Sequence, residues 1–205
     1  MEILRKSVVI ALLIGSQFIQ AQDQKVVQEA FVKSYALETA KKQNEAIDVL
    51  KSLSNSENYP IQLRLAWLYY SSKRYDESVA AYKKAAELMP ASIEALLGIV
   101  NPLAVQKKWS EVEQVYVSIL KIDPKNSQTN FRLGQIYYNR KDYAKADKYF
   151  STSLNLYPFD YDSMLMSGWN CYFLGKYSEA KELFNRVLLY SPLDTSAKEG
   201  LGLIK

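Results

Sequence analysis

The sequence predicts an all-α fold in which one pair of helices is repeated along the chain. Prolines recur at a constant interval, at Pro90, Pro124, Pro158 and Pro192. Aromatic residues recur at the same interval, at Tyr75, Trp109, Tyr143 and Tyr177. No segment shows the apolar and polar alternation that a strand requires. A fixed period of about 34 residues is typical of a stacked array of helix pairs, so we expect one extended all-α domain.

The units that end at Pro158 and Pro192 show what each helix contributes. Each first helix contains two adjacent residues of which the second is glycine. Each second helix contains an alanine and, four positions later, a phenylalanine. These residues are Leu133-Gly134 and Ser167-Gly168, then Ala146, Phe150, Ala180 and Phe184. The spacings resemble the tetratricopeptide repeat. In that family small residues let two antiparallel helices approach closely while aromatic rings fill the gap. The resemblance implies a right-handed superhelical solenoid of about five repeats with a C-terminal capping helix.

The other units follow the pattern less closely. The unit that ends at Pro90 keeps it, with Ser78 in place of the alanine. In the next unit Leu97-Gly98 arrives two residues early and Asn101-Pro102 follows, so we expect a kinked or shortened first helix. The residues before these units form a degenerate first helix pair, joined near Lys42 to Asn44.

The predicted organisation follows from the repeat. It comprises a signal peptide (1–21), a degenerate first helix pair (22–58), four repeats (59–90, 91–124, 125–158 and 159–192) and a capping helix (193–205). Helices are expected near 60–72, 75–88, 92–105, 109–121, 127–139, 143–156, 161–174 and 177–190. Asp194, Thr195 or Ser196 would begin the capping helix. Its apolar Leu201, Leu203 and Ile204 either turn inward or are covered by a partner.

The N-terminus has the pattern of a secretory signal peptide. Arg5 and Lys6 precede an apolar run over residues 8–15, which is shorter than the roughly 20 residues that a membrane span needs. We predict cleavage after Ala21 and a periplasmic location. An uncleaved N-terminal anchor is the alternative, because Phe18 and Ile19 extend the apolar run.

Composition argues against an enzyme. The chain has no histidine and one cysteine, which excludes Ser-His and Cys-His nucleophile pairs, most transition-metal sites and an internal disulfide. We therefore expect no cofactor, no metal site and no small-molecule substrate. The net charge of +4 is small and the charged residues are interspersed, so we expect no nucleic-acid partner. Cys171 is interpreted as a buried apolar residue, with a mixed disulfide to a partner as the alternative.

The resemblance also implies where a ligand would bind, because this family binds ligands on a concave surface lined by first helices. The matching residues here are Leu63, Trp67, Tyr70, Asn101, Phe131, Gln135, Tyr138, Leu165, Trp169 and Tyr172. Trp67 and Trp169 stand where a groove that reads charge would carry asparagine, and no lysine accompanies them. The clamp for C-terminal carboxylates known in the family is therefore absent. The alternative is that both tryptophans pack between repeats.

Three functional hypotheses follow, and the third, an enzyme that acts on an envelope glycan through unpaired carboxylates, has no spacing of carboxylates to support it. The leading one is a non-enzymatic scaffold of the cell envelope that binds a peptide or protein segment in an aromatic concave groove. The alternative is a structural subunit of an envelope or secretion assembly that acts through its edge or its C-terminal cap. The edge carries basic residues at the turns: Lys73-Arg74, Lys107-Lys108, Arg140-Lys141 and Lys176. They either complement helix dipoles or contact an anionic surface, so membrane contact and self-association stay open.

Overall fold

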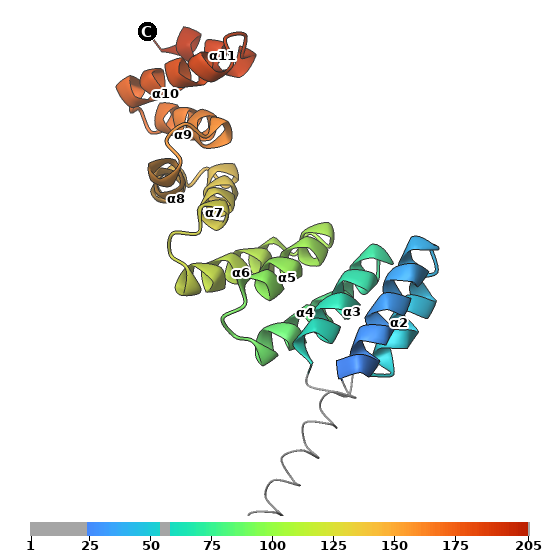
Figure 1. The fold of residues 1–205 in the computed structure, drawn as a ribbon. Coiled ribbons are helices and arrows are strands. Elements are labelled where there is room, and N and C mark those ends of the chain that lie inside the picture. The colour runs from blue at the N-terminus through green and yellow to red at the C-terminus, as the bar shows by residue number, and fades with distance from the viewer. Residues whose placement is uncertain (1–23, 54–57, 205) are drawn as a thin grey trace, which may run out of the picture. The chain divides into compact units, whose positions relative to one another are not determined.

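The computed structural model describes residues 24–53 and 58–204. Their regular structure is entirely helical, without a strand in these two ranges, which confirms the all-α prediction (Figure 1). The predicted signal peptide and its cleavage site at Ala21 lie outside the described residues. Within the described part, no helix combines the length and the hydropathy that crossing a membrane requires.

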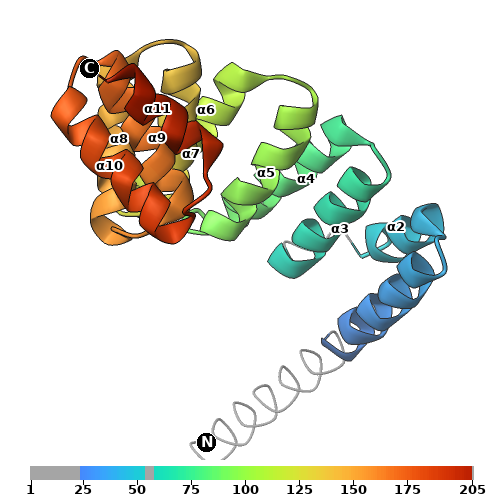
Figure 2. The same cartoon turned by 90° about the horizontal axis from the view of Figure 1, so that it is seen from above.

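The chain divides into two compact units, Met1–Gln106 (unit 1) and Lys107–Lys205 (unit 2). The boundary falls inside the predicted repeat 91–124. Unit 1 contains a helix over residues 24–39, then α2 (Gln43–Lys51), α3 (Tyr59–Ser71), α4 (Tyr75–Leu88) and α5 (Ile93–Val105). Unit 2 contains α6 (Trp109–Ile122), α7 (Ser127–Asn139), α8 (Tyr143–Leu156), α9 (Tyr161–Phe173), α10 (Tyr177–Tyr190) and α11 (Thr195–Leu203). Neighbouring helices such as α3 and α4, or α9 and α10, pack side by side (Figures 1 and 2).

Helices α3, α5, α7, α9 and α11 each begin at a capping side chain. Each cap accepts a hydrogen bond from the backbone N–H three residues later, at 2.7 to 3.2 Å. The caps themselves recur at the interval of the prolines, at Asn58, Ser92, Asn126, Asp160 and Asp194. Of the three candidates for the start of α11, Asp194 is therefore the cap. The helices match the predicted ranges to within about one residue.

The helix over residues 24–39 and helices α3, α5, α7 and α9 are each followed, two residues after their last helical residue, by a left-handed residue. Their φ angles lie between 58° and 76°, at Lys41, Lys73, Lys107, Lys141 and Gly175. At the end of α3, Lys73 N–H bonds to the Tyr70 carbonyl at 2.9 Å and Arg74 N–H bonds to the Tyr69 carbonyl at 2.8 Å. This pair of bonds satisfies carbonyls that the helix leaves open. The predicted join near Lys42 to Asn44 was placed too late, because the chain turns over residues 40–42 instead.

Glycine and phenylalanine hold the helix pairs together in unit 2. A Cβ atom on Gly134 would lie 2.5 Å from the Phe150 ring, and one on Gly168 would lie 2.8 Å from the Phe184 ring. Both phenylalanines are fully buried. The close approach of paired helices is therefore confirmed. In unit 1, Ser78 is equally buried, and its hydroxyl donates a 2.8 Å hydrogen bond to the Ala66 carbonyl.

The expectation of a shortened α5 is wrong. This helix has 13 residues, as do α3, α7 and α9, although Pro102 lies inside it. Gly98 also does not have the packing role of Gly134, which faces the helix that follows it. A Cβ atom there would overlap the Tyr82 ring of the preceding helix, just as one on Gly200 would overlap Phe184. Gly98 and Gly200 thus allow close packing between successive repeats.

The C-terminal helix resolves the alternative for its apolar residues. Leu201 and Ile204 pack against the buried cluster that includes Phe184 and Val187. Leu203 remains 49% exposed. Most of this cap therefore turns inward and completes the core of unit 2.

Candidate functional site

The helix over residues 24–39, α3, α4 and α5 enclose a groove of about 470 Å³, called the unit 1 groove below. Its walls are mostly apolar or aromatic. They are formed by Phe31, Tyr35, Pro60, Leu63, Arg64, Trp67, Tyr82, Glu94 and Gly98. The helix over residues 24–39 and α5 each contribute one pair of residues four positions apart, and α3 contributes two such pairs. This spacing places both members of a pair on one face of the helix.

Two aromatic side chains of the groove are open to solvent. Tyr35 is 53% exposed and Trp67 is 45% exposed. Exposed aromatic residues of this kind are enriched among the energetic anchors of binding surfaces. The groove therefore offers a ligand apolar area on a rigid helical support.

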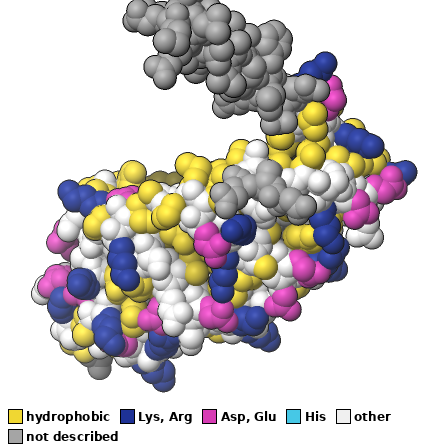
Figure 3. Space-filling model, turned by 90° about the horizontal axis from the view of Figure 1, so that it is seen from below, with side chains coloured by type: hydrophobic (Ala, Val, Ile, Leu, Met, Phe, Trp, Pro, Cys, Tyr) yellow, Lys and Arg dark blue, Asp and Glu magenta, His cyan; other side chains and the backbone are white. Residues whose placement is uncertain are grey.

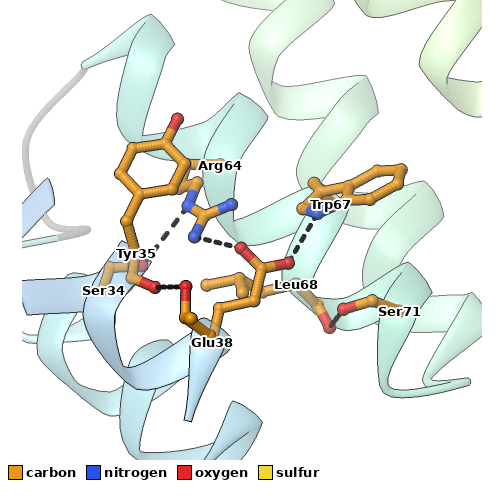
Figure 4. A network of polar contacts seen from close by, with 8 residues as sticks. Ser34, Tyr35, Glu38, Arg64, Trp67, Leu68 and Ser71 are labelled. Atoms are coloured by element: carbon orange, nitrogen blue, oxygen red, sulfur yellow. Dashed lines mark hydrogen bonds and ion pairs between the residues drawn. The ribbon is translucent and has the colours of Figure 1, made fainter. Parts of the chain in front are cut away.

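A partly buried ion pair holds Trp67 in position (Figure 4). The Glu38 carboxylate accepts hydrogen bonds from Arg64 Nη2 at 2.5 Å and from Trp67 Nε1 at 2.9 Å. Arg64 Nε also donates to Ser34 Oγ at 3.3 Å, and the guanidinium lies 3.8 Å from the centre of the Tyr35 ring. Arg64 is 7% exposed. Its charge is thus neutralised inside the wall of the groove.

The other charged group of the groove is Glu94, in the first turn of α5. Its Oε2 accepts a 3.2 Å hydrogen bond from the Tyr59 hydroxyl, which also lies 2.6 Å from Ser92 Oγ. Burial and then the Glu94 charge raise the pKa of Tyr82, which also lines the groove. The Glu94 side chain is exposed. It therefore gives the groove a negative end.

The structure places the predicted residues of unit 1 in different settings. Leu63 and Trp67 line the groove. Tyr70 lies beside it, with its ring centre 6.0 Å from that of Trp67. Asn101 is exposed on α5 but lies outside the groove lining.

The predicted residues of α7 take part mainly in packing. The rings of Phe131 and Tyr138 lie 5.8 and 6.4 Å from the buried Phe150 ring. Gln135 Oε1 accepts a 2.9 Å hydrogen bond from Arg132. All three predicted residues remain partly exposed, so they cover the core of unit 2 while keeping some contact with solvent.

The predicted residues of α9 form the support of α11. Trp169 Nε1 donates a 2.8 Å hydrogen bond to Ser196 Oγ. The Trp169 and Phe184 rings form a T-shaped pair with their centres 5.2 Å apart. Leu165 and Tyr172 pack against the same buried cluster. Trp169 occupies the position of Trp67 in its repeat, yet α11 covers part of it. The alternative of packing between repeats describes Trp169 better than Trp67.

Sequence reasoning missed Phe31, Tyr35 and Arg64. The interval between the left-handed turns at Lys41 and Lys73 is two positions shorter than the interval from Lys73 to Lys107. With this shorter offset Phe31 matches Leu63, and Tyr35 matches Trp67. The spacing of the turns could therefore have extended the groove into the first repeat.

The remaining candidates are the basic turns and Cys171. In the basic turns, Arg74 pairs with Glu77 at 2.8 Å and Lys176 pairs with Asp147 at 2.8 Å, so acidic neighbours neutralise part of the edge. Figure 3 likewise shows basic and acidic side chains interspersed on the face drawn. Burial raises the pKa of Cys171 to about 11, which favours an inert thiol. No group of His, Cys, Asp and Glu residues suited to a metal ion occurs in the described ranges.

Sequence models of the tetratricopeptide repeat match residues 60–92, 127–160 and 161–192. These three segments carry tetratricopeptide repeats. The general transcriptional corepressor trfA of Dictyostelium discoideum is 28% identical over 133 residues, which cover 64% of this chain and 10% of that protein. The tetratricopeptide repeat protein 21 homolog of Caenorhabditis elegans is 28% identical over 93 residues, which cover 45% of this chain and 7% of that protein. This chain thus spans about a tenth of the length of these curated relatives or less.

Solved structures show the same fold. A tetratricopeptide repeat protein from Parabacteroides merdae superposes with a TM-score of 0.71 at 19% identity, covering 86% of this chain and 71% of the other. MamA from Desulfovibrio magneticus gives a TM-score of 0.65 at 16% identity, covering 83% and 98%. YrrB, described as a tetratricopeptide repeat protein with an unusual peptide-binding site, gives 0.65 at 13% identity, covering 83% and 89%. Proteins of this repeat family generally mediate protein–protein interactions and typically have no enzymatic activity.

Proposed function

We propose that this protein is a non-enzymatic scaffold of the cell envelope that binds a peptide or protein segment in the unit 1 groove. The observation that carries the proposal is the half-exposed Trp67, held by Glu38 against an apolar wall. Preorganised aromatic groups bind with a small loss of side-chain entropy. The peptide-binding site described for YrrB is consistent with this function but belongs to that protein.

Site-specific photo-crosslinking tests the groove. The crosslinking amino acid p-benzoylphenylalanine replaces Leu63 in the groove or, as the control, the exposed Lys83 of α4. We expect a partner in the envelope extract to crosslink at position 63 and not at position 83. The Trp67→Ala substitution should remove that product. Equal crosslinking at both positions would contradict recognition by the groove.

The location in the envelope has support from the sequence only, through the charged and apolar N-terminal segment. The N-terminal residue of the protein isolated from its source tests it. We expect the mature chain to begin at Gln22. A mature chain that begins at Met1 in a cytoplasmic fraction would contradict the proposed location.

The assembly-subunit function also has an observation in its favour. Large apolar side chains near the end of unit 2 are exposed, including Leu189 at 75% and Leu193 at 81%. Exposed apolar residues of this kind mark interaction surfaces when they are contiguous. Light scattering of the Leu189→Glu, Leu193→Glu double variant tests it. A lower mass than that of the unchanged protein supports self-association here, and an equal mass contradicts it.

A further inference from the structure

The two charged side chains of the unit 1 groove differ in how available they are to a ligand. The groove lining contains one cation, Arg64, and one carboxylate, Glu94. Arg64 is occupied by Glu38, by Ser34 and by the face of the Tyr35 ring, and its side chain is almost fully buried. The guanidinium is therefore not available to a ligand, either as a hydrogen-bond donor or as a free cation.

Glu94 offers the opposite situation. Its Oε2 accepts one hydrogen bond from Tyr59, whereas its Oε1 has no hydrogen-bond donor within the described ranges. A carboxylate can accept several hydrogen bonds, so the Tyr59 contact leaves most of this capacity open. The side chain is exposed and lies in the same groove as the exposed Trp67 ring.

We propose that the unit 1 groove selects a peptide segment that combines an apolar side chain with a lysine or arginine. The apolar side chain lies against Leu63 and Trp67, and the cation binds the Glu94 carboxylate. This inference rests on the proposed function of the groove. The charge of the occupant follows from complementarity, because the ion pair of Arg64 leaves the groove with a net negative charge. The exposed Trp67 ring adds to this preference, since the face of a Trp ring attracts cations.

An acidic residue in the first turn also stabilises a helix through the helix dipole, and the experiment must separate the two roles. Glu111 provides the matched control, because it is the acidic residue in the first turn of α6 in unit 2. Glu94→Gln and Glu111→Gln should therefore lower helix stability to a similar extent. Only Glu94→Gln should weaken binding of the selected peptides.

The probe is a displayed library of random 12-residue peptides, selected on the full-length protein. We expect enrichment of peptides that contain a lysine or arginine near an apolar residue. Fluorescence anisotropy then compares binding of an enriched peptide to four proteins: the unchanged protein, Glu94→Gln, Glu111→Gln and Trp67→Ala. Glu94→Gln should raise the Kd about three- to tenfold at low salt, and Glu111→Gln should leave it unchanged. Replacing the cation of the peptide by norleucine should abolish the difference between the unchanged protein and Glu94→Gln.

Different results would overturn the role of Glu94 and the role of the groove. Enriched peptides without a basic residue, or equal Kd values for Glu94→Gln and the unchanged protein, would overturn the role of Glu94. If Trp67→Ala also leaves every Kd unchanged, the groove itself is not the binding site. A concentration-dependent dimer of the protein alone that Trp67→Ala abolishes would identify a second copy as the occupant and overturn the inference.

Discussion

Gly134 and Gly202 occupy the same position of the repeat, but a side chain added at each meets opposite surroundings. At Gly134 a Cβ atom would lie 2.5 Å from Phe150, whereas nothing lies within 4 Å of one at Gly202. Phe150 is fully buried and packs against the rings of Phe131 and Tyr138, so it has little room to withdraw. The same substitution to alanine should therefore have opposite effects.

The magnitudes follow from two competing terms. Alanine in place of glycine favours a helix by about 1 kcal/mol, and overpacking of a core costs about 1–3 kcal/mol. Gly134→Ala should therefore lower the free energy of unfolding by about 1 kcal/mol. Gly202→Ala should raise it by about 0.5 kcal/mol, because the residue lies near the end of α11 where helix propensity counts less.

Urea unfolding followed by far-UV circular dichroism measures both effects. Both glycines belong to unit 2, so they report on the same cooperative region. The Gly134→Ala, Phe150→Leu double variant should lose less unfolding free energy than the two single variants lose together, because the smaller leucine side chain relieves the overlap with the alanine. The close contact of Gly134 and Phe150 would be refuted if Gly134→Ala raised the free energy of unfolding. It would also be refuted if Gly202→Ala lowered that free energy as much as Gly134→Ala does.

Three further predictions concern turns, titration and the thiol. Lys73→Gly should stabilise unit 1 by up to about 1 kcal/mol in urea unfolding, and Gly175→Ala should destabilise unit 2 by about 1 kcal/mol, because both positions are left-handed. The hydrogen bond from the Tyr137 hydroxyl lowers the pKa of Glu113 in the folded protein. The stabilisation from this bond is therefore fully present above the ordinary pKa of a glutamate, and it is lost as the pH falls through the lowered pKa of Glu113. Tyr137→Phe should therefore flatten the loss of thermal stability between about pH 5 and pH 3; an unchanged slope would contradict this linkage. Cys171 should react with a thiol reagent at pH 8 only after unfolding, and rapid reaction of the native protein would contradict its burial.

The repeat period predicted most of the fold because it combines several local signals. Prolines limit the second helices: α4 ends at Leu88, and Met89 before Pro90 leaves helical geometry. The small residues at Gly134 and Gly168 set the close approach of the paired helices. These signals are local in sequence or repeat at a fixed interval, so helix ranges could be read without a structure.

The candidate site was less predictable because it depends on contacts between repeats. Trp67 and Trp169 are equivalent in the repeat, but Glu38 holds one at the surface and α11 covers the other. The pairing of Arg64 with Glu38 joins residues 26 positions apart, a separation that no repeat interval indicates. The shorter interval between the first two left-handed turns also hid Phe31 and Tyr35.

The most direct test of the account compares Trp67→Ala with Trp169→Ala in binding the tightest peptide from the library. With 45% of its surface exposed, Trp67 offers a ligand about 100 Å² of apolar area, equivalent to about 2.5 kcal/mol and about a 60-fold change in Kd. We predict this loss of affinity for Trp67→Ala. For Trp169→Ala we predict an unchanged Kd and a lower free energy of unfolding, because the ring packs against Phe184 and α11. Equal losses of affinity, or a loss confined to Trp169→Ala, would contradict recognition by the unit 1 groove.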